Sequence, residues 1–452
     1  MNVQEKVMFL QQLREGFDQI GALFPTSSSA ARAMVADVAR HQGPKTILEV
    51  GAGTGPITAE LVKLLGPDDQ LVVCEMNEKF MNHLIERFDR EPSFANVRHQ
   101  VEFCCKSVLE VDGTERFDYI VSTLPFTSLG ADLVAQIFDH YQRLLKPGAV
   151  LTYIEYAYLR NLRTQLAGST ARAKAERTNL ILDGNIERYQ FRREVVPANL
   201  PPAWVRSLRF TEVPPDKALH IKPIANRKRL SLGRFGLSTE SFGLLAGLGA
   251  AALLLKKKKS KAWVAPLALA GAAAWFHRDP EREVRANTAV AYSAADGRVL
   301  GIERLRHPRL GDQEWLRINV FLSLGDVHIN RSPIAGKVVD KWDEPGGYSP
   351  AFRSEANNNE SRYIVIEGAD LRCAVAQRSG ALARTIYTWC EKGELLCQGE
   401  RYGMIRFGSR TDVYLPADRV EVLVSEGDRV VAGQTPLARL VSRASDGQKA
   451  SE

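Results

Sequence analysis

The sequence is poor in cysteine and lacks the spacing by which cysteines commonly hold a metal. Six cysteines occur among 452 residues, and no two of them form a C-x-x-C pair. The sequence therefore predicts neither a metal site nor a disulfide framework, and it favours a reducing, cytoplasmic setting. The N-terminal stretch MNVQEKVMFLQQLREGF lacks the apolar core of a signal peptide and predicts an amphipathic helix.

The sequence also lacks an uninterrupted apolar run long enough for a simple membrane span. Two apolar runs occupy Phe242–Leu255 and Ala262–Phe276, each shorter than the roughly 20 residues that cross hydrocarbon. The four lysines of Lys256–Lys259 divide them and cannot lie at the centre of a bilayer. We expect a hairpin or two interfacial helices, with the lysines at the head groups. Two short tilted spans and a buried soluble core are the alternatives.

Positive charge is in modest excess and unevenly placed. Lysine and arginine outnumber aspartate and glutamate by 60 to 53, and residues 160–234 contain 16 basic and 6 acidic side chains. Such an excess suits an anionic partner, either nucleic acid or an acidic membrane surface. The chain has 45% hydrophobic and 25% charged residues, which is typical of globular proteins, and its length predicts two or three domains.

A glycine-rich turn in the N-terminal part indicates a nucleotide-like ligand. The apolar strand TILEV runs into GAGTG, and a helix follows. The glycines of this turn are Gly51, Gly53 and Gly55. Glycines let the backbone approach a ligand at the carboxyl end of a strand. A second apolar strand, Leu71–Cys74, ends at Glu75, whose carboxylate can accept both hydroxyls of a ribose. A dinucleotide and S-adenosylmethionine both fit this pattern.

The segment LEVGAGTGPIT resembles the first motif of class I methyltransferases, in which an acidic residue precedes G-x-G-x-G. Glu49 holds that position. The resemblance implies an α/β, Rossmann-like domain that binds S-adenosylmethionine through Glu49, the three glycines and Glu75. A strand-end charge facing solvent is the alternative for Glu49. Members often carry a carboxylate for adenine after the third strand. The stretch FCCKS has none here, so Ser107 or a backbone N–H would serve instead.

The segment STLPF resembles the Asn/Ser-x-x-Pro-Tyr/Phe loop of N-adenine and N-phospholipid methyltransferases. Its candidate substrate residues are Ser122, Leu124, Pro125 and Phe126. Such a loop would orient an amine lone pair and stack an aromatic ring beside the forming cation. FPTSS, at 24–28, resembles the Pro-Ser-Ser segment of bacterial phosphatidylethanolamine N-methyltransferases. This half is also similar to ribosomal-RNA adenine dimethylases, so RNA is the alternative substrate.

Two further predictions concern the end of this domain. Tyr153, Glu155 and Tyr156 lie at the end of a predicted strand and could bind a methylated ammonium, with ordinary strand packing as the alternative. Residues 205–211 and 218–224 are expected to form the last hairpin of the sheet.

Beyond residue 280 the pattern is that of a mainly β, sandwich-like or barrel-like domain. Short strands are predicted at 299–302, 316–322, 363–366 and 413–415. The hairpin SEGDRVVAG, at 425–433, also occurs in lipoyl-type sandwich folds. It lacks a lysine at its tip, which argues against a carrier of lipoyl or biotinyl groups.

A Gly-Ser pair, Gly408 and Ser409, stands between two strand-like runs, where by itself it would predict a turn. Three segments precede it: SAADGRV with Asp296, GDVHINRSPIAG with His328, and NNNESRY with Asn359 and Glu360. In this order they resemble the phosphatidylserine decarboxylases, most closely the short form, which also occurs with archaeal lipid substrates. The resemblance extends from about 266 to 440 and includes WFHRDP. Asn359 and Glu360 would lie in a loop near the site.

The resemblance implies that the chain cuts itself between Gly408 and Ser409. Ser409 would become a pyruvoyl group, which accepts electrons as carbon dioxide leaves the lipid. His328 would take the Ser409 proton, and Asp296 would orient His328. Longer bacterial enzymes carry histidines spaced H-x-x-H, whereas this sequence has His328 and then Arg331. His328 would then serve both self-cleavage and later protonation, or water would take one role.

The sequence thus predicts a methyltransferase domain at 1–230, a basic and apolar membrane-anchoring hairpin at 231–280, and a decarboxylase domain at 281–452. The C-terminal half would convert phosphatidylserine to phosphatidylethanolamine, and the N-terminal half would methylate that amine towards phosphatidylcholine. Expected partners are an anionic phospholipid membrane, these lipids and the chain's own cleaved α and β chains, without nucleic acid. The basic flanks predict the cytoplasmic face of the inner cell membrane.

Two other interpretations stay open at this point. In one, an adenine dimethylase-like methyltransferase is fused to an inactive, membrane-anchored β domain. In the other, the chain is a non-catalytic membrane scaffold with a degenerate C-terminal sandwich. The second interpretation predicts that the bond between Gly408 and Ser409 stays intact.

Overall fold

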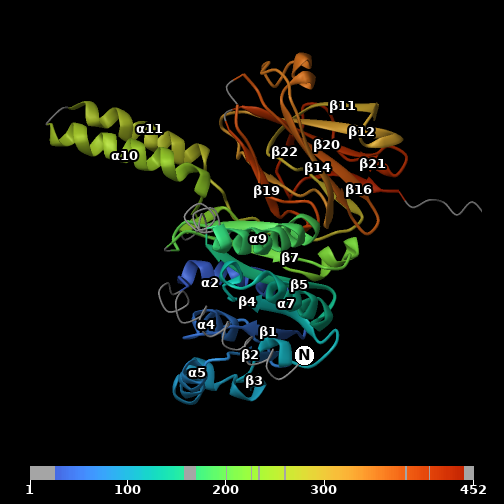
Figure 1. Ribbon diagram of the computed structural model, residues 1–452. Helices are drawn as coiled ribbons and strands as arrows, with labels where there is room; N and C mark the ends of the chain where they lie inside the picture. Colours follow the sequence, from blue (N-terminus) through green and yellow to red (C-terminus); the bar gives the residue numbers. More distant parts are fainter. Residues whose placement is uncertain are drawn as a thin grey trace, which may run out of the picture. The chain divides into compact units, whose positions relative to one another are not determined.

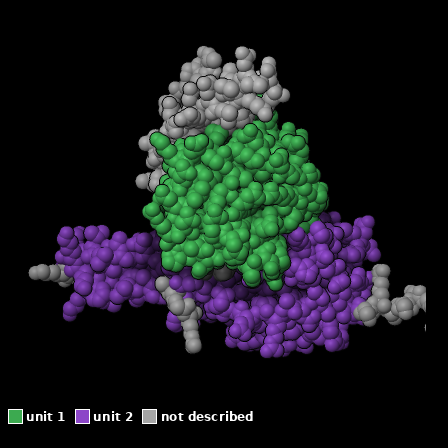
Figure 2. Space-filling model, turned by 90° about the horizontal axis from the view of Figure 1, so that it is seen from below, with its two compact units in different colours: residues 1–213 green, residues 214–452 purple. Residues whose placement is uncertain are grey.

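The computed structural model describes residues 26–156, 169–199, 201–224, 227–232, 235–258, 261–381, 384–406 and 408–441. Two compact units, Met1–Val213 and Pro214–Glu452, make up the chain (Figures 1 and 2). The division into parts at 1–230, 231–280 and 281–452 stays a prediction. The amphipathic helix expected at the N-terminus lies outside the described residues, as does Phe407.

The first unit is built on a seven-stranded sheet with the order β3-β2-β1-β4-β5-β7-β6. Its strands are β1 (Thr46–Val50), β2 (Gln70–Cys74), β3 (Val101–Cys104), β4 (Phe117–Ser122), β5 (Leu145–Tyr156), β6 (Gln190–Val196) and β7 (Ala203–Leu208). Strands β1 to β5 pair parallel with one another, while β7 pairs antiparallel with β5 and β6. The last hairpin is therefore β6–β7. The expected strand at 218–224 is wrong, because residues 215–220 form a 3-10 helix.

Helices cover both faces of this sheet. They are α2 (Ser28–Met34), α3 (Ala36–Arg40), α4 (Pro56–Val62), α5 (Glu78–Arg90), α6 (Pro92–Ala95), α7 (Ala131–Leu144) and α9 (Ser169–Tyr189). Successive residues of a strand point to opposite faces, so Ile47 and Leu48 enter two separate hydrophobic clusters. Burial on both faces explains why the parallel strands are continuous apolar runs. The Rossmann-like α/β prediction is confirmed.

The second unit is mostly β. Its strands are β8 (Arg229–Leu232), β9 (Phe235–Ser238), β10 (Val290–Tyr292), β11 (Gly297–His307), β12 (Gly311–Leu322), β13 (Ile329–Arg331), β14 (Gly336–Glu344), β15 (Ser361–Glu367), β16 (Arg372–Arg378), β17 (Ile386–Thr388), β18 (Leu395–Leu396), β19 (Arg401–Ile405), β20 (Ser409–Pro416), β21 (Val420–Val422), β22 (Arg429–Val430) and β23 (Pro436–Leu440). The largest sheet has the order β18-β14-β15-β16-β20-β12-β11-β22. Strand β20, which begins at Ser409, lies inside it between β16 and β12.

The two apolar runs form the helices α10 (Phe242–Lys257) and α11 (Val264–Phe276), which lie side by side (Figure 1). In α10 only Ala252 is buried, and in α11 only Phe276. By length and composition, the 19 residues Thr239–Lys257 are the one segment that could cross a membrane as a helix within the described part of the chain. Because each of these helices buries a single residue, the alternative of a buried soluble core is wrong.

A buried ion pair ties α3 to the antiparallel edge of the first sheet. Arg192 donates from Nη1 to Oδ1 of Asp37 at 2.9 Å and from Nη2 to Oδ2 at 2.7 Å. The hydroxyl of Ser207 donates to Oδ2 at 2.8 Å. Both charged side chains are almost fully buried, so each depends on the other for its lost hydration.

We predict that Asp37→Ala lowers the free energy of unfolding of the first unit by about 3–5 kcal/mol, because Arg192 is left as an unpaired buried charge. Urea denaturation followed by circular dichroism measures this loss. The control, Glu176→Ala, removes an exposed ion pair with Arg172 and should cost less than about 1 kcal/mol. Equal losses for the two variants would contradict the prediction.

Candidate active sites

The glycine turn of the first unit has the backbone conformation that its sequence implied. Gly51, Gly53 and Gly55 have φ angles of 76°, 55° and 83°, in the left-handed region. A Cβ on Gly55 would lie 2.5 Å from the Leu84 side chain and 2.8 Å from that of Arg87. Glycine is thus required here both by conformation and by space.

Glu75 stands at the carboxyl end of β2 and faces this turn. Its Oε2 accepts from the backbone N–H of Gly53 at 2.9 Å, and its Oε1 accepts from that of Asn77 at 2.8 Å. Burial raises the pKa of Glu75 above its ordinary value. The carboxylate and the glycine turn therefore meet at one place. This donor and acceptor set fits a ribose with its attached chain at the strand ends.

Glu49, in β1, is fully buried beneath the same turn. Its Oε1 accepts from the Thr58 hydroxyl at 3.0 Å, and its Oε2 has no hydrogen-bond partner among the described residues. Burial raises the pKa of Glu49 to about 8. The alternative of a solvent-facing charge is wrong, because the Glu49 side chain is fully buried.

Ser107 uses its polar groups within its own turn. Its hydroxyl accepts from the Leu109 N–H at 3.3 Å, and its N–H donates to Glu110 Oε2 at 3.1 Å. This reciprocal capping occupies the Ser107 side chain, which was expected to contact adenine, together with the N–H of the same residue. The role of Ser107 as an adenine contact stays a prediction, and these contacts do not favour it.

Two of the predicted site residues attach the loop after β4 to the core of the first unit. The Ser122 hydroxyl is fully buried and accepts from the Tyr141 hydroxyl at 2.9 Å. Phe126 is buried against Phe138 and Tyr153, with ring centroids 5.1 and 5.4 Å away. Leu124 is also buried, whereas Pro125 is half-buried. Ser122 and Phe126 therefore support the loop, and their side chains are already used.

Thr123, which was not among the predicted site residues, joins this loop to the glycine turn. Its N–H donates to the Val50 carbonyl at 2.9 Å, and its hydroxyl reaches the carbonyls of Val50 and Gly51. The loop and the predicted cofactor turn are thus neighbours. The sequence motif could not indicate a role for Thr123, because this residue occupies one of the variable positions of the motif.

Two members of the tyrosine and glutamate cluster on β5 are packed inside the first unit, and Tyr156 is half-buried. Tyr153 is buried in the core, and Glu155 accepts from Arg206 Nε at 2.8 Å in a buried ion pair. These contacts favour packing for both side chains, and a role in binding an ammonium group stays a prediction.

In the second unit, His328 lies against the predicted scissile bond. Gly408 donates its N–H to Nε2 of His328 at 3.4 Å. The other ring nitrogen, Nδ1, lies 3.0 Å from the Asp326 carbonyl oxygen. A carbonyl only accepts, so Nδ1 carries the proton and Nε2 keeps its lone pair. Both contacts therefore specify one neutral tautomer, with its acceptor facing the Gly408–Ser409 segment.

Burial lowers the pKa of His328 to about 4. The imidazole is consequently neutral around pH 7 and able to accept a proton. Its ring lies 4.2 Å from that of Phe276, centroid to centroid, at an interplanar angle of 39°. Ser409 is fully buried, and its Oγ makes no hydrogen bond within the part of the chain that the structure describes.

The backbone of Gly380 lies directly against the carbonyl of the scissile bond. A Cβ on Gly380 would stand 2.3 Å from the Gly408 oxygen. Asn359 fixes the neighbouring loop by donating to the carbonyls of Ser349 and Ser379, each at 2.8 Å. Sequence reasoning missed Gly380, whose close approach comes from strands distant in the chain.

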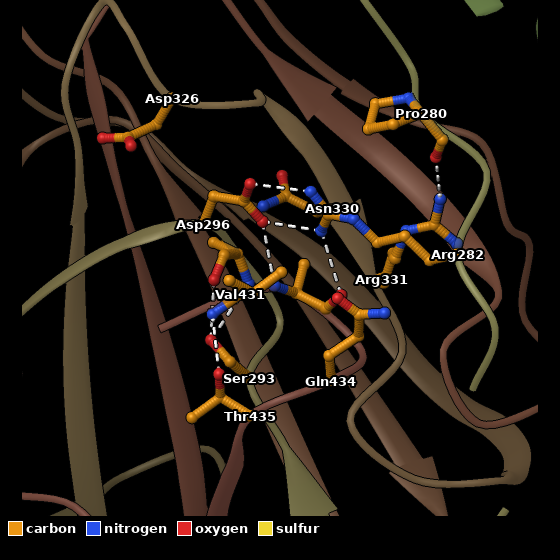
Figure 3. Close-up of polar contacts among 12 residues, drawn as sticks. Pro280, Arg282, Ser293, Asp296, Asp326, Asn330, Arg331, Val431, Gln434 and Thr435 are labelled. Atoms are coloured by element: carbon orange, nitrogen blue, oxygen red, sulfur yellow. Dashed lines mark hydrogen bonds and ion pairs between the residues drawn. The ribbon is translucent and has the colours of Figure 1, made fainter. Parts of the chain in front are cut away.

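Asp296 does not hydrogen-bond His328. Its carboxylate accepts from Nη1 and Nη2 of Arg282 at 2.6 and 2.7 Å and from the Ala432 N–H at 2.9 Å (Figure 3). The predicted direct pairing is absent among the described contacts, where the carboxylate pairs with Arg282 and both ring nitrogens of His328 face backbone groups.

Arg331, which stands where longer enzymes have a second histidine, binds backbone. Its guanidinium donates to the Gly399 carbonyl at 3.0 Å and to the Pro280 carbonyl at 3.1 Å. The side chain is buried and forms an ion pair with Asp279 at 3.5 Å. These contacts give Arg331 a role in holding the chain that precedes β10.

Two family models match the chain. Residues 269–438 match the phosphatidylserine decarboxylases, and residues 47–148 match a methyltransferase domain. A phosphatidylserine decarboxylase proenzyme of Symbiobacterium thermophilum is 45% identical over 183 residues, covering 39% of this chain and 85% of that protein. One from Pelobacter propionicus is 37% identical, covering 45% and 96%. A putative archaetidylserine decarboxylase proenzyme of Halobacterium salinarum is 44% identical, covering 40% and 87%.

Solved methyltransferases have low similarity to part of the chain. The O-methyltransferase TomG of Streptomyces achromogenes, in complex with SAM, is 18% identical, covers 46% of this chain and 99% of its own, and has a TM-score of 0.32. A SAM-dependent methyltransferase from Aquifex aeolicus is 17% identical, covers 44% and 97%, and has a TM-score of 0.31. The family matches support the expected cofactors, S-adenosylmethionine for the first unit and a pyruvoyl group for the second. The chain belongs to the phosphatidylserine decarboxylase family through its C-terminal half, which follows an N-terminal S-adenosylmethionine-dependent methyltransferase domain.

Proposed function

We propose that the chain carries out two consecutive reactions on one lipid head group. The second unit decarboxylates phosphatidylserine to phosphatidylethanolamine, and the first unit transfers methyl groups to that amine, towards phosphatidylcholine. The observation that carries the proposal is the contact between His328 Nε2 and the N–H of Gly408, at a Gly-Ser bond whose serine is fully buried. The product of the decarboxylase is the substrate proposed for the methyltransferase, which gives the fusion a chemical reason.

Maturation begins when the Ser409 hydroxyl attacks the Gly408 carbonyl carbon. His328 Nε2 takes the hydroxyl proton, and the peptide bond rearranges to an ester. Loss of the ester by β-elimination leaves a dehydroalanine at residue 409 and a carboxylate on Gly408. Hydrolysis of the dehydroalanine releases ammonia and leaves the pyruvoyl group. The lone pair at Nε2 and the buried, unpartnered Ser409 hydroxyl support this assignment.

The pyruvoyl group supplies an electron sink for decarboxylation. The chain's own residues place the lipid, exclude water and return a proton to its head group. We assign that proton transfer to His328, since Arg331 is used elsewhere. Asp296 acts through Arg282, and its carboxylate holds the turn at Ala432.

For the first unit, Glu75 would bind the ribose hydroxyls, and the glycine turn would let the rest of S-adenosylmethionine approach the backbone. The cofactor supplies an electrophilic methyl group on a sulfonium. Placement and desolvation of the acceptor amine provide most of the rate, so a strong base is not required. Thr123 supports this arrangement because it fixes the substrate loop to the turn.

We propose that the acceptor is a lipid amine and that the chain works at the cytoplasmic face of the inner membrane, on anionic phospholipid. The exposed leucines of α10 and α11 support a membrane location, and Lys256, Lys257 and Lys258 supply positive charge beside them. The decarboxylase domain on the same chain favours lipid over RNA.

The wild-type protein, purified from membranes, should consist of residues 1–408 and residues 409–452, the latter with a blocked N-terminus. Ser409→Ala should remain a single uncut chain, because the attacking hydroxyl is gone. Intact-mass spectrometry distinguishes the two results. The control, Ser425→Ala, removes an exposed serine of the same unit and should still be cut. An uncut wild-type chain would contradict the proposed maturation.

Self-cleavage should persist in mildly acidic solution. The pKa of His328 is lowered to about 4, so its base form is present well below the ordinary histidine range and is lost only as pH falls through that value. His328→Gln should slow cleavage at least about 100-fold. The rate is measured on freshly synthesised precursor between about pH 4 and 8. His307→Gln is the control, and a wild-type rate that already falls around pH 6.5 would overturn the assignment.

Labelled S-adenosylmethionine should transfer its methyl group into lipid extract. With phosphatidylserine vesicles as the sole lipid, the wild type should label the lipid, whereas Ser409→Ala should do so only when phosphatidylethanolamine is supplied. Glu75→Gln should weaken S-adenosylmethionine binding at least about tenfold by calorimetry, through loss of its ribose contact. The exposed Glu78→Gln is the control. Label that appears in RNA and not in lipid would refute the lipid assignment.

A further inference from the structure

The first end of the apolar hairpin is attached to the chain that leads into the scissile bond. A short 3-10 helix, Thr239–Ser241, precedes α10. The carbonyl oxygen of Glu240 accepts from Nη2 of Arg406, which lies two residues before Gly408. The base of α10 and the cleavage segment are thus joined by a direct hydrogen bond.

The second end of the hairpin reaches His328 itself. Phe276, the last residue of α11, is 5% exposed, although Trp275 beside it is 62% exposed. Its ring packs in a buried cluster with Val327, Ile329 and Met404. Within this cluster it covers the His328 imidazole, at the ring separation of 4.2 Å.

Backbone contacts fix Phe276 in this place. The N–H of Ser238 donates to the His277 carbonyl at 2.9 Å, and the N–H of Asp279 donates to the Gly236 carbonyl at 2.7 Å. Arg278 donates from Nη2 to the Gly325 carbonyl at 2.6 Å, in the loop that leads to His328. The exit of α11 is therefore fastened both to β9 and to the histidine loop.

We propose that Phe276 is a positioning residue for His328, so that the apolar hairpin forms part of the decarboxylase site in addition to anchoring it. The inference rests on the proposed role of His328 in maturation. In this proposal, Phe276 at the end of α11 holds the imidazole so that Nε2 faces the Gly408 N–H.

The physical reason is that, within the part of the chain that the structure describes, the imidazole has two hydrogen-bonding contacts, the Asp326 carbonyl at Nδ1 and the Gly408 N–H at Nε2. Neither contact prevents water from reaching the ring faces. Phe276 covers a face, excludes water there and restricts rotation about the side chain. The charged groups that act on the imidazole are Asp326 and Asp296, which favour its protonation, and Arg278, which opposes it.

The test uses the full-length precursor with three substitutions. Phe276→Ala should slow self-cleavage, and its acid limb should move upward towards the ordinary histidine pKa as water enters. At about pH 5.5 this shift alone removes about tenfold of the base form. Phe276→Leu, which keeps apolar cover without a flat ring, should cleave more slowly than wild type with an almost unchanged acid limb. Phe235→Ala, an exposed aromatic on β9, should behave as wild type.

Intact mass gives the cleaved fraction over time and pH, and thermal unfolding shows whether each variant is folded. If Phe276→Ala does not fold, the rate and acid limb of Phe276→Leu decide the outcome. A wild-type rate and acid limb in the folded Phe276 variants would overturn the positioning role while leaving that of His328 intact. Undiminished cleavage by His328→Gln would instead remove the proposed function on which the inference rests.

Discussion

A buried neutral imidazole is satisfied when the hydrogen-bonding groups beside its two nitrogens require the same tautomer. The candidate site of the second unit depends on this condition. The Asp326 carbonyl requires a proton on Nδ1, and the Gly408 N–H requires a lone pair on Nε2. Both partners come from loops that the sheet places together, since Ser409 pairs with Leu322 at the end of β12. The site therefore depends on strand register between distant segments of the chain.

Local sequence was sufficient to predict that the glycine turn and Glu75 of the first unit lie together. A left-handed glycine turn needs only its own residues, and an acidic side chain at the end of the next parallel strand arrives beside it by topology. The contact between Gly53 and Glu75 follows from these two facts. Ser107 differs because its side chain had a competing local use as a helix cap, which the spacing to Glu110 could have indicated.

Tertiary packing decided the features that the sequence could not predict. The burial of Ser122 depends on Tyr141, which approaches from α7, and no pattern within the loop records it. Asp296 likewise pairs with Arg282. Its segment precedes that of His328 in the series of motifs, but this order did not predict a hydrogen bond between the two side chains. Motifs identified which segments meet, while the partner of each side chain was set by whichever charge or hydroxyl the fold brought closest.

In both units, burial shifts the pKa of an ionisable side chain in the direction that favours its neutral form. Desolvation favours the neutral form of a group, which raises the pKa of Glu49 to about 8 and lowers that of His328 to about 4. Burial alone would also raise the pKa of Asp412, but Arg410 and Arg378 hold it below its ordinary value. Charge therefore persists inside the chain where arginines fix strands to one another. Within the described residues, the imidazole assigned to chemistry forms no ion pair, and for that reason it can be neutral and accept a proton.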